Sequence, residues 1–254
     1  MIKLFRNIRQ NLLAEGKTSR YLKYAIGEII LVVIGILIAL QLNNLKENKN
    51  ASKKELALLV NIKNDLEADI YNLKRQDSIY AKREKDSELG IDLFYKAKTI
   101  KDIDSVMGLT LGVWSELYIN QNTYNEMINS GSMYSMKNKE LQKKINKYYL
   151  LVEARVEYIR SVNVEQGQLW ELDTNLYPLK LLTSQMKNPR IDIKSIDTTW
   201  INNPKSPTYL SLNNYLNSNQ ESSNVYRREV FRRLLIGAEA LLVDLDEELS
   251  SRKN

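Results

Sequence analysis

The stretch YAIGEIILVVIGILIALQL, residues 24–42, decides the architecture of this chain. It is almost entirely apolar, with Glu28 as its one charged side chain. As a helix it would be roughly 28 Å long, at about 1.5 Å per residue, which is close to the hydrocarbon thickness of a bilayer. The adjacent Tyr21, Lys23 and Tyr24 resemble the aromatic and basic belt of a membrane interface. We therefore expect a single transmembrane helix, with its membrane segment at residues 21–44.

Two other interpretations of this stretch stay open. A buried core helix would explain the apolar character, since the uninterrupted part, residues 29–40, is short for a membrane span. A cleaved secretory signal would explain the basic start of the chain. However, that start exceeds twenty residues, and Ala39-Leu40-Gln41 is not a small-residue cleavage site. An uncleaved signal anchor fits better.

The basic residues on either side bear on orientation. Residues 1–23 hold six Lys and Arg and residues 41–63 hold five, but Arg is confined to the first window. A short leading segment is usually retained while a large following domain crosses the membrane. We expect the amino terminus in the cytoplasm.

Residues 1–20 form a basic amphipathic segment, which we expect to lie on the cytoplasmic membrane surface. A frayed basic tail that only sets topology is the alternative. As a helix the segment would separate an apolar arc (Ile2, Leu4, Phe5, Ile8, Leu12, Leu13) from a polar side (Lys3, Arg6, Gln10, Lys17).

Within the apolar stretch, Glu28, Gly35 and Ala39 fall within about 40° on a helical wheel. The stripe joins an ionisable group to a small-xxx-small surface that another helix could approach closely. It predicts a helix-pairing site. The alternative is a tolerated carboxylate near the interface, with small residues placed by chance.

Residues 45–254 predict a helical extramembrane domain, because no Pro or Gly occurs between residue 43 and Gly90. We expect a mostly α protein in which the transmembrane helix continues into a long helical stalk and an antiparallel helical bundle. Shorter helices should be divided near Thr99, and a second long helix should follow Ser130-Gly131-Ser132. The expected core positions are Leu59, Ile62, Leu66, Ile70, Leu73, Asp77 and Tyr80, then Leu141, Ile145, Tyr148, Val152, Val156, Ile159, Val162, Gln166 and Leu169.

All four Pro occur in a Ser- and Asn-rich region, which predicts an irregular excursion at about residues 173–224, with a short helix near 209–216. The last helix, about 225–249, carries charges that oppose its macrodipole. Pairing within the bundle would compensate this arrangement; a docking surface for a partner is the other hypothesis. The charges are Arg227, Arg228, Arg232 and Arg233 at the start, and Asp244, Asp246, Glu247 and Glu248 at the end.

Composition excludes several chemistries. The chain has no Cys and no His, which removes thiol catalysis, Ser-His-Asp triads and zinc sites built on those residues. No Walker loop, GxGxxG, G-x-S-x-G, HExxH or EF-hand pattern occurs. We therefore expect neither an enzyme nor a cofactor. Residues 1–42 carry +4 of the net charge of +6, which favours lipid headgroups over nucleic acid as the partner.

Three stretches resemble one family. Residues 24–44 (YAIGEIILVVIGILIALQLNN), 123–131 (TYNEMINSG) and 141–149 are similar to an uncharacterised family of small single-pass membrane proteins common in Bacteroidota. The resemblance extends along most of the chain and is weakest in 173–224. It implies a domain of unknown function, anchoring in the bacterial inner membrane and a helical body, and it supplies no catalytic residues.

These patterns favour a non-enzymatic, membrane-anchored interaction or scaffold module, with its helical domain in the periplasm. Its partners would be the lipid bilayer and either another envelope protein or a second copy of the chain. The alternative is a ligand-sensing input module that signals across the membrane through a partner, since some twenty leading residues cannot hold an output domain.

Overall fold

A computed structural model describes residues 18–110, 117–171 and 197–252 of the chain. Every regular element in these ranges is helical, which confirms the expected fold class. The expected surface helix lies mostly in residues 1–17, outside the described residues. The elements in chain order are α2 (Thr18–Phe94), α3 (Ile100–Thr110), α4 (Asn122–Asn129), α5 (Ser132–Ser135), α6 (Lys139–Glu171), the 3₁₀ helix η3 (Thr199–Asn202), α8 (Pro207–Val225), the π helix η4 (Tyr226–Phe231) and α9 (Arg232–Ser251).

The chain divides into two compact units, Met1–Ala57 and Leu58–Asn254. Helix α2 contributes residues to both, because it runs from Thr18 to Phe94 without a break. This confirms that the apolar helix continues into the helical body.

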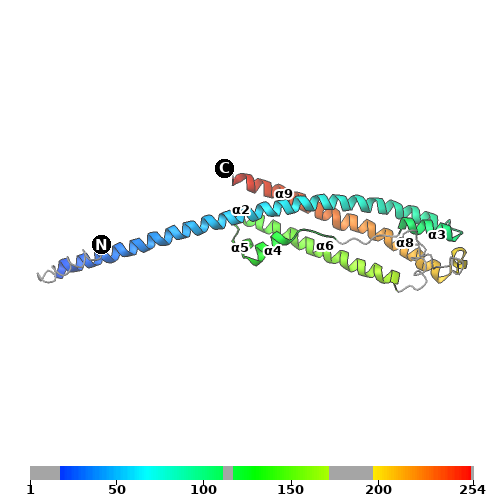
Figure 1. Cartoon of the computed structure of the whole chain (residues 1–254), viewed down its shortest axis with the longest axis horizontal. Helices are drawn as coiled ribbons and strands as arrows, with labels where there is room; N and C mark the ends of the chain where they lie inside the picture. The colour runs from blue at the N-terminus through cyan, green and yellow to red at the C-terminus, as the bar shows by residue number, and fades with distance from the viewer. Residues whose placement is uncertain (1–17, 111–116, 172–196, 253–254) are drawn as a thin grey trace, which may run out of the picture. The chain divides into compact units, whose positions relative to one another are not determined.

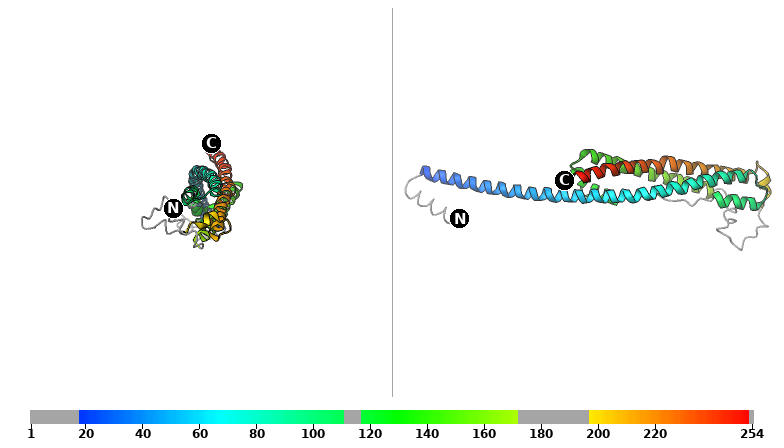
Figure 2. Two further views of the ribbon diagram at one scale, coloured as in Figure 1. Left: turned by 90° about the vertical axis from the view of Figure 1, so that its right-hand side faces the viewer. Right: turned by 90° about the horizontal axis from the view of Figure 1, so that it is seen from above.

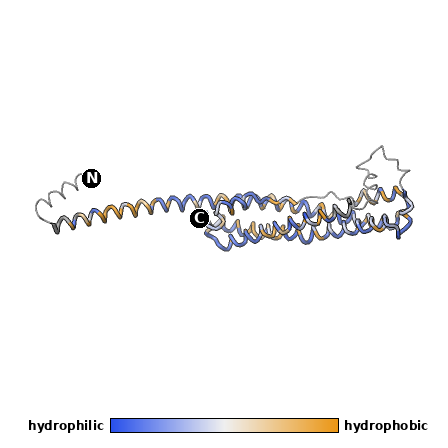
Figure 3. Tube along the Cα trace, turned by 90° about the horizontal axis from the view of Figure 1, so that it is seen from below, coloured by the Kyte–Doolittle hydropathy of each residue, from blue (hydrophilic) through white to orange (hydrophobic). Residues whose placement is uncertain are grey.

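In the first unit, α2 contains a strongly hydrophobic stretch, drawn in orange in Figure 3. The large side chains of this stretch are exposed. Ile29, Leu31 and Leu42 are each more than 60% exposed. Among the described residues, one helix is long and apolar enough to cross a membrane, and none of its apolar window is buried. Within the described ranges, the window therefore lacks the covering protein neighbours that a core helix requires.

The second unit is a bundle in which α2 from Leu58 onward, α6, and the continuous α8–η4–α9 segment lie side by side (Figures 1 and 2). Helix α9 is antiparallel to both of its long neighbours, as expected. Along each neighbour, a higher residue number pairs with a lower residue number of α9. On α2, Lys63 pairs with Asp246 and Lys74 with Glu239. At the start of α6, Asn138 donates a hydrogen bond to Glu248 and Lys144 pairs with Asp244.

The inner stripe of α2 follows the expected spacing with one correction. Leu59, Ile62, Leu66 and Leu73 have no exposed surface, and Tyr80 is buried. Between Leu66 and Leu73, however, the buried position is Asp69 rather than Ile70, which is only half-buried. The stripe thus places a carboxyl group inside the bundle.

Helix α6 begins at Lys139, later than the turn at Gly131 suggested, because the short α5 intervenes. Gly131 has φ of 72°, a left-handed conformation that glycine adopts without a Cβ penalty. The Asn138 side chain then accepts a hydrogen bond from the backbone N–H of Leu141 (3.0 Å), as an N-cap does. The predicted core positions from Leu141 to Ile159 are buried or half-buried; the side chains of Gln166 and Leu169 are outside the described set.

The division near Thr99 is confirmed, because α2 ends at Phe94 and α3 begins at Ile100. Thr99 and Asp102 cap α3 reciprocally: Asp102 accepts from the Thr99 backbone N–H (2.8 Å), and Thr99 Oγ1 accepts from the Asp102 N–H (3.4 Å). This end of the bundle has a core that joins α2, α3, η3 and α8: Phe94, Ala97, Ile103, Val106, Met107, Trp200, Ile201, Leu212, Tyr215 and Leu216.

The prediction of an irregular excursion at residues 173–224 is wrong for the second half of that range. Residues 172–196 lie outside the described residues, but α8 occupies Pro207–Val225, well beyond the short helix expected at 209–216. Pro207 stands in the first turn, where a missing N–H costs nothing, and Ser206 accepts a hydrogen bond from the Tyr209 N–H (3.2 Å). Burial of Leu212 and Leu216 in the core then outweighs the low helix propensity of the many Asn and Ser residues.

Candidate functional site

Two polar clusters lie in the bundle, and each joins elements that are distant in sequence. The first is named here the acid–tyrosine cluster. It consists of Asp65 and Asp69 of α2, Asn120 of the segment before α4, Thr123 and Tyr124 of α4, and Tyr148 and Tyr149 of α6. The second, the arginine cluster, consists of Asp77 and Glu84 of α2 with Arg227, Arg228, Glu229, Arg232 and Arg233 of η4 and α9.

Asp69 is the centre of the acid–tyrosine cluster, with no exposed surface at all. Among the described residues, its carboxylate accepts hydrogen bonds from Asn120 alone: from the backbone N–H (3.1 and 3.2 Å to the two oxygens) and from Nδ2 (2.7 Å). One turn earlier, Asp65 accepts from Thr123 Oγ1 (2.5 Å). The two carboxyl groups therefore hold the segment that leads into α4 against α2.

Burial raises the pKa of Asp69 to about 6, because the charged form loses its hydration. The hydrogen bonds from Asn120 act in the opposite direction, and the nearby Asp65 charge adds to the increase. Asp69 is thus a buried carboxyl group that exchanges its proton in a mildly acidic range.

The tyrosines close the cluster on the α6 side. The Tyr124 ring stacks on Tyr149 with centroids 4.3 Å apart and planes at 13°, and the Tyr124 hydroxyl donates to Asn146 Oδ1 (2.8 Å). The hydroxyls of Tyr148 and Tyr149 are buried and have no hydrogen-bond partner among the described residues. Burial raises the pKa of both phenols, and the negative charge of Asp69 contributes. Both hydroxyls stay neutral at physiological pH.

This cluster was not predicted from the sequence. The spacing of apolar residues along α2 indicated only a core, and Tyr148 was expected as a core position. One signal was present: Asp69 follows Leu66 by three and precedes Leu73 by four, so it falls on the buried stripe. Two of the three stretches with the family resemblance, 123–131 and 141–149, are in contact through the stacked rings of Tyr124 and Tyr149.

The arginine cluster is built around Arg227, whose side chain is 19% exposed. Its Nε donates to Asp77 Oδ1 (3.2 Å), and its terminal nitrogen pairs with Glu84. Burial acts to lower the pKa of Arg227, but the hydrogen bonds to Glu84 and Asp77 outweigh it, and the pKa is raised. Arg227 is therefore a cation that joins η4 to α2 within the bundle.

The other three predicted docking residues lie on the surface. Arg228, Arg232 and Arg233 expose 59%, 54% and 55% of their side chains. Arg232 reaches Asp77 (3.4 Å), whereas Arg228 and Arg233 both contact Glu229 (3.1 and 2.8 Å). Pairing inside the bundle is thus present for Arg227 and, at the surface, for Arg232.

The π helix places these arginines beside an aromatic contact. The Tyr80 ring of α2 meets Tyr226 (5.6 Å between centroids, edge to face) and Phe231 (5.1 Å), at the two ends of η4. The Tyr226 hydroxyl donates to Asn163 Oδ1 of α6 (3.0 Å). All three long segments of the bundle therefore meet at η4.

The predicted helix-pairing stripe lies on the first unit. Gly35 and Ala39 are exposed and Glu28 is partly exposed. A Cβ added to Gly35 would meet nothing within 4 Å, so the glycine leaves room for a close neighbour. The pairing role of the stripe stays a prediction.

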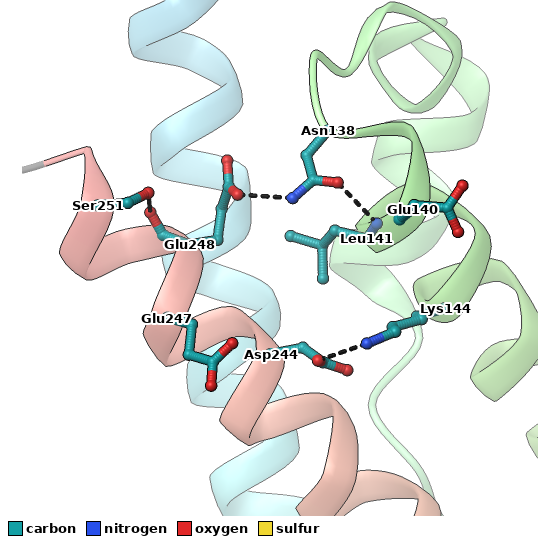
Figure 4. A pocket seen from close by; sticks show the side chains of 8 residues that line it. All are labelled: Asn138, Glu140, Leu141, Lys144, Asp244, Glu247, Glu248 and Ser251. Carbon is teal, nitrogen blue, oxygen red and sulfur yellow. Dashed lines mark hydrogen bonds and ion pairs between the residues drawn. The ribbon is translucent and has the colours of Figure 1, made fainter.

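A shallow groove separates the start of α6 from the end of α9 (Figure 4). Its volume is about 340 Å³, and Asn138, Lys144, Asp244 and Glu248 bridge it by hydrogen bonds and an ion pair. Burial of these groups is incomplete and their charges are already paired, so the groove fits an interhelical seam. Among the described residues, no three His, Cys, Asp or Glu are grouped as metal ligands would be.

Fold and clusters together define an all-helical protein in which one apolar, exposed helical stretch is joined in the same chain to a bundle with buried polar contacts. The chain belongs to a family of unknown function, DUF6090, whose model matches residues 28–175. That match begins inside the apolar stretch and includes the whole acid–tyrosine cluster. No curated protein and no solved structure matches the chain.

Proposed function

We propose that this protein is a membrane-anchored helical interaction or scaffold module of the bacterial envelope, without enzymatic activity. The exposed apolar side chains of residues 29–42 carry the proposal. Apolar surface left in water costs about 25 cal/mol per Å², so a stretch that is apolar on every face requires a bilayer or a partner. A bacterial inner membrane supplies the bilayer, with the amino terminus in the cytoplasm and residues 58–254 in the periplasm.

Membrane fractionation tests the anchor with two matched double variants of the full chain. Val33→Lys with Ile36→Lys places two charges in the apolar stretch, at a cost of about 3 kcal/mol each near a bilayer centre. Ile236→Lys with Val243→Lys makes the same change at exposed positions of α9. We expect the first variant to leave the carbonate-washed membrane pellet and the second to stay in it. A native chain in the soluble fraction would sink the proposal.

Orientation has its own measurement. In spheroplasts, external protease should degrade the carboxyl-terminal domain of the anchored chain, and it should leave an amino-terminal tag intact. Protection of the domain in intact spheroplasts would place it in the cytoplasm instead.

The interaction role rests on two surfaces. In the bilayer, Gly35 and Ala39 would face a second helix, and a cysteine cross-linking scan over residues 25–40 should then show helical periodicity. On the bundle, Arg228, Arg232 and Arg233 are the exposed cations of the arginine cluster. Their joint reversal to Glu should release a protein that co-purifies with the native chain in mild detergent, and retention of that protein would contradict the docking surface.

A sensing input module is the second candidate, because two buried hydroxyls of the acid–tyrosine cluster have no hydrogen-bond partner in the described part of the chain. Such a module would signal through a partner protein. A small molecule retained by the purified chain would favour sensing, whereas a bound protein without one would favour the scaffold.

A further inference from the structure

The acid–tyrosine cluster contains an arrangement that responds to protons. We propose that Asp69 is the proton-binding group of a pH-dependent clasp, which fastens residues 117–123 and the start of α4 to α2. The proposal concerns the second unit alone and does not depend on the membrane anchor.

Three hydrogen bonds from Asn120 and one to Asp65 make the clasp. Asn120 donates its backbone N–H to both oxygens of Asp69 and its Nδ2 to one of them, and Thr123 donates to Asp65. Asp69 has no exposed surface, and the hydrogen bonds from Asn120 hold the 117–123 segment against its carboxyl group. Opening the clasp would therefore hydrate the carboxyl group.

The groups that face Asp69 come from each neighbouring element. Asp65 lies one turn away on α2, Asn120 is in the segment before α4, Tyr124 is in α4, and Tyr148 and Tyr149 are on α6. Among these groups Asp65 is the one other carboxyl group, and its charge repels a charged Asp69. Within the described residues, the charged form is thus supported by neutral donors and opposed by a second carboxylate.

A proton changes this balance in favour of the closed form. The neutral carboxyl group loses its desolvation penalty and gains an O–H donor, while its other oxygen still accepts from Asn120. The buried hydroxyl oxygens of Tyr148 and Tyr149, which have no partner among the described residues, are acceptors of the kind that this donor needs. Protonation therefore closes the clasp.

The sign follows from linkage between proton binding and opening. The pKa of Asp69 is about 6 when closed and returns toward 3.8 when the group is hydrated in the open form. The closed form gains stability as pH falls through this interval and loses it as pH rises through about 6. The opening equilibrium constant should rise roughly tenfold between pH 5 and pH 8.

Hydrogen–deuterium exchange of the full chain in detergent micelles tests the clasp. After correction for the intrinsic pH dependence of exchange, amides of residues 117–129 should open about tenfold more often at pH 8 than at pH 5. Asp69→Asn mimics the neutral form and should lose that pH dependence. Asp92→Asn, an exposed carboxylate on the same helix, should keep it.

Equal opening at pH 5 and pH 8 in the native chain would overturn the proposal, and so would full pH dependence in the Asp69→Asn variant. Infrared spectroscopy of the native chain gives a test that needs no variant. A protonated carboxyl band should disappear on titration near pH 6, above the ordinary range of Asp, and absence of such a band would overturn the assignment to Asp69.

Discussion

Between Ile29 and Leu42, α2 is apolar on every face, whereas from Leu58 onward the same helix keeps its large apolar side chains mainly on one buried stripe. Both parts are equally helical, so secondary structure does not distinguish them. The surroundings do. An all-round apolar helix needs an apolar solvent, while an amphipathic helix needs partner helices on one side. Hence the same substitution should destabilise the bundle in the second part and leave its stability unchanged in the first.

The largest expected effect comes from the buried stripe. Leu66→Ala should lower the free energy of unfolding of the bundle by about 2–5 kcal/mol, because Leu66 has no exposed surface and its removal leaves a cavity. Leu37→Ala, at a 56% exposed position of the apolar stretch, should leave it unchanged. Chemical denaturation in micelles, followed by tryptophan fluorescence, measures both. Equal losses would mean that the apolar stretch packs against protein.

A smaller effect is expected where α2 meets α3. A Cβ at Gly90 would lie 2.3 Å from Thr110 Cγ2, and Thr110 is held in place because Oγ1 donates to the Val106 carbonyl (2.8 Å). Gly90→Ala should therefore cost about 1–3 kcal/mol through overpacking. Gly35→Ala, in open space, should cost nothing measurable in the same denaturation experiment. A tolerated Gly90→Ala would show that α3 can move away from α2.

The arginine cluster should give a smaller loss. Arg227→Ala removes the least exposed arginine that pairs with Asp77 and Glu84. We expect a loss of about 1–2 kcal/mol of stability, since these ion pairs are only partly buried. Thermal unfolding of the native and variant chains measures this loss, and full stability of the Arg227→Ala variant would contradict it.

The smallest effect belongs to the surface arginines. Arg228→Ala and Arg233→Ala each remove an exposed ion pair with Glu229 and should change stability by less than about 0.5 kcal/mol. A larger loss in the isolated chain would assign these residues a structural role. Their value for a partner would then be harder to separate from folding.

How far the sequence predicts this fold depends on what each stretch shows locally. The spacing of Leu59, Ile62, Leu66 and Leu73 gives the inner face of α2, because a helical stripe is a local property. The burial of Asp69 was not predicted. A carboxyl group inside a bundle needs hydrogen-bond donors, and Asn120, which supplies them, is fifty-one residues away in sequence. The residues around Asp69 contain no pattern that indicates a hydrogen-bond donor so far away in sequence.

The full length of helix α8 was not predicted for a different reason. Its Asn and Ser content is typical of irregular chain, and the core around Trp200 and Leu212 that stabilises it is assembled from four elements. The start of the helix was nonetheless visible in Ser206-Pro207, a cap followed by a first-turn proline. A capping residue and a first-turn proline can thus indicate where a helix begins even when its composition is unfavourable for a helix.

The π helix between Tyr226 and Phe231 has a consequence for chain length. A π turn holds about one residue more than the same turn of α-helix, so α8 and α9 remain continuous around a locally longer chain. A natural or engineered deletion of one residue here could close as regular α-helix with both flanking faces in register. The same deletion inside α9 would rotate everything beyond it by about 100° and expose the buried leucines. Insertions and deletions in homologous chains should therefore concentrate at this turn.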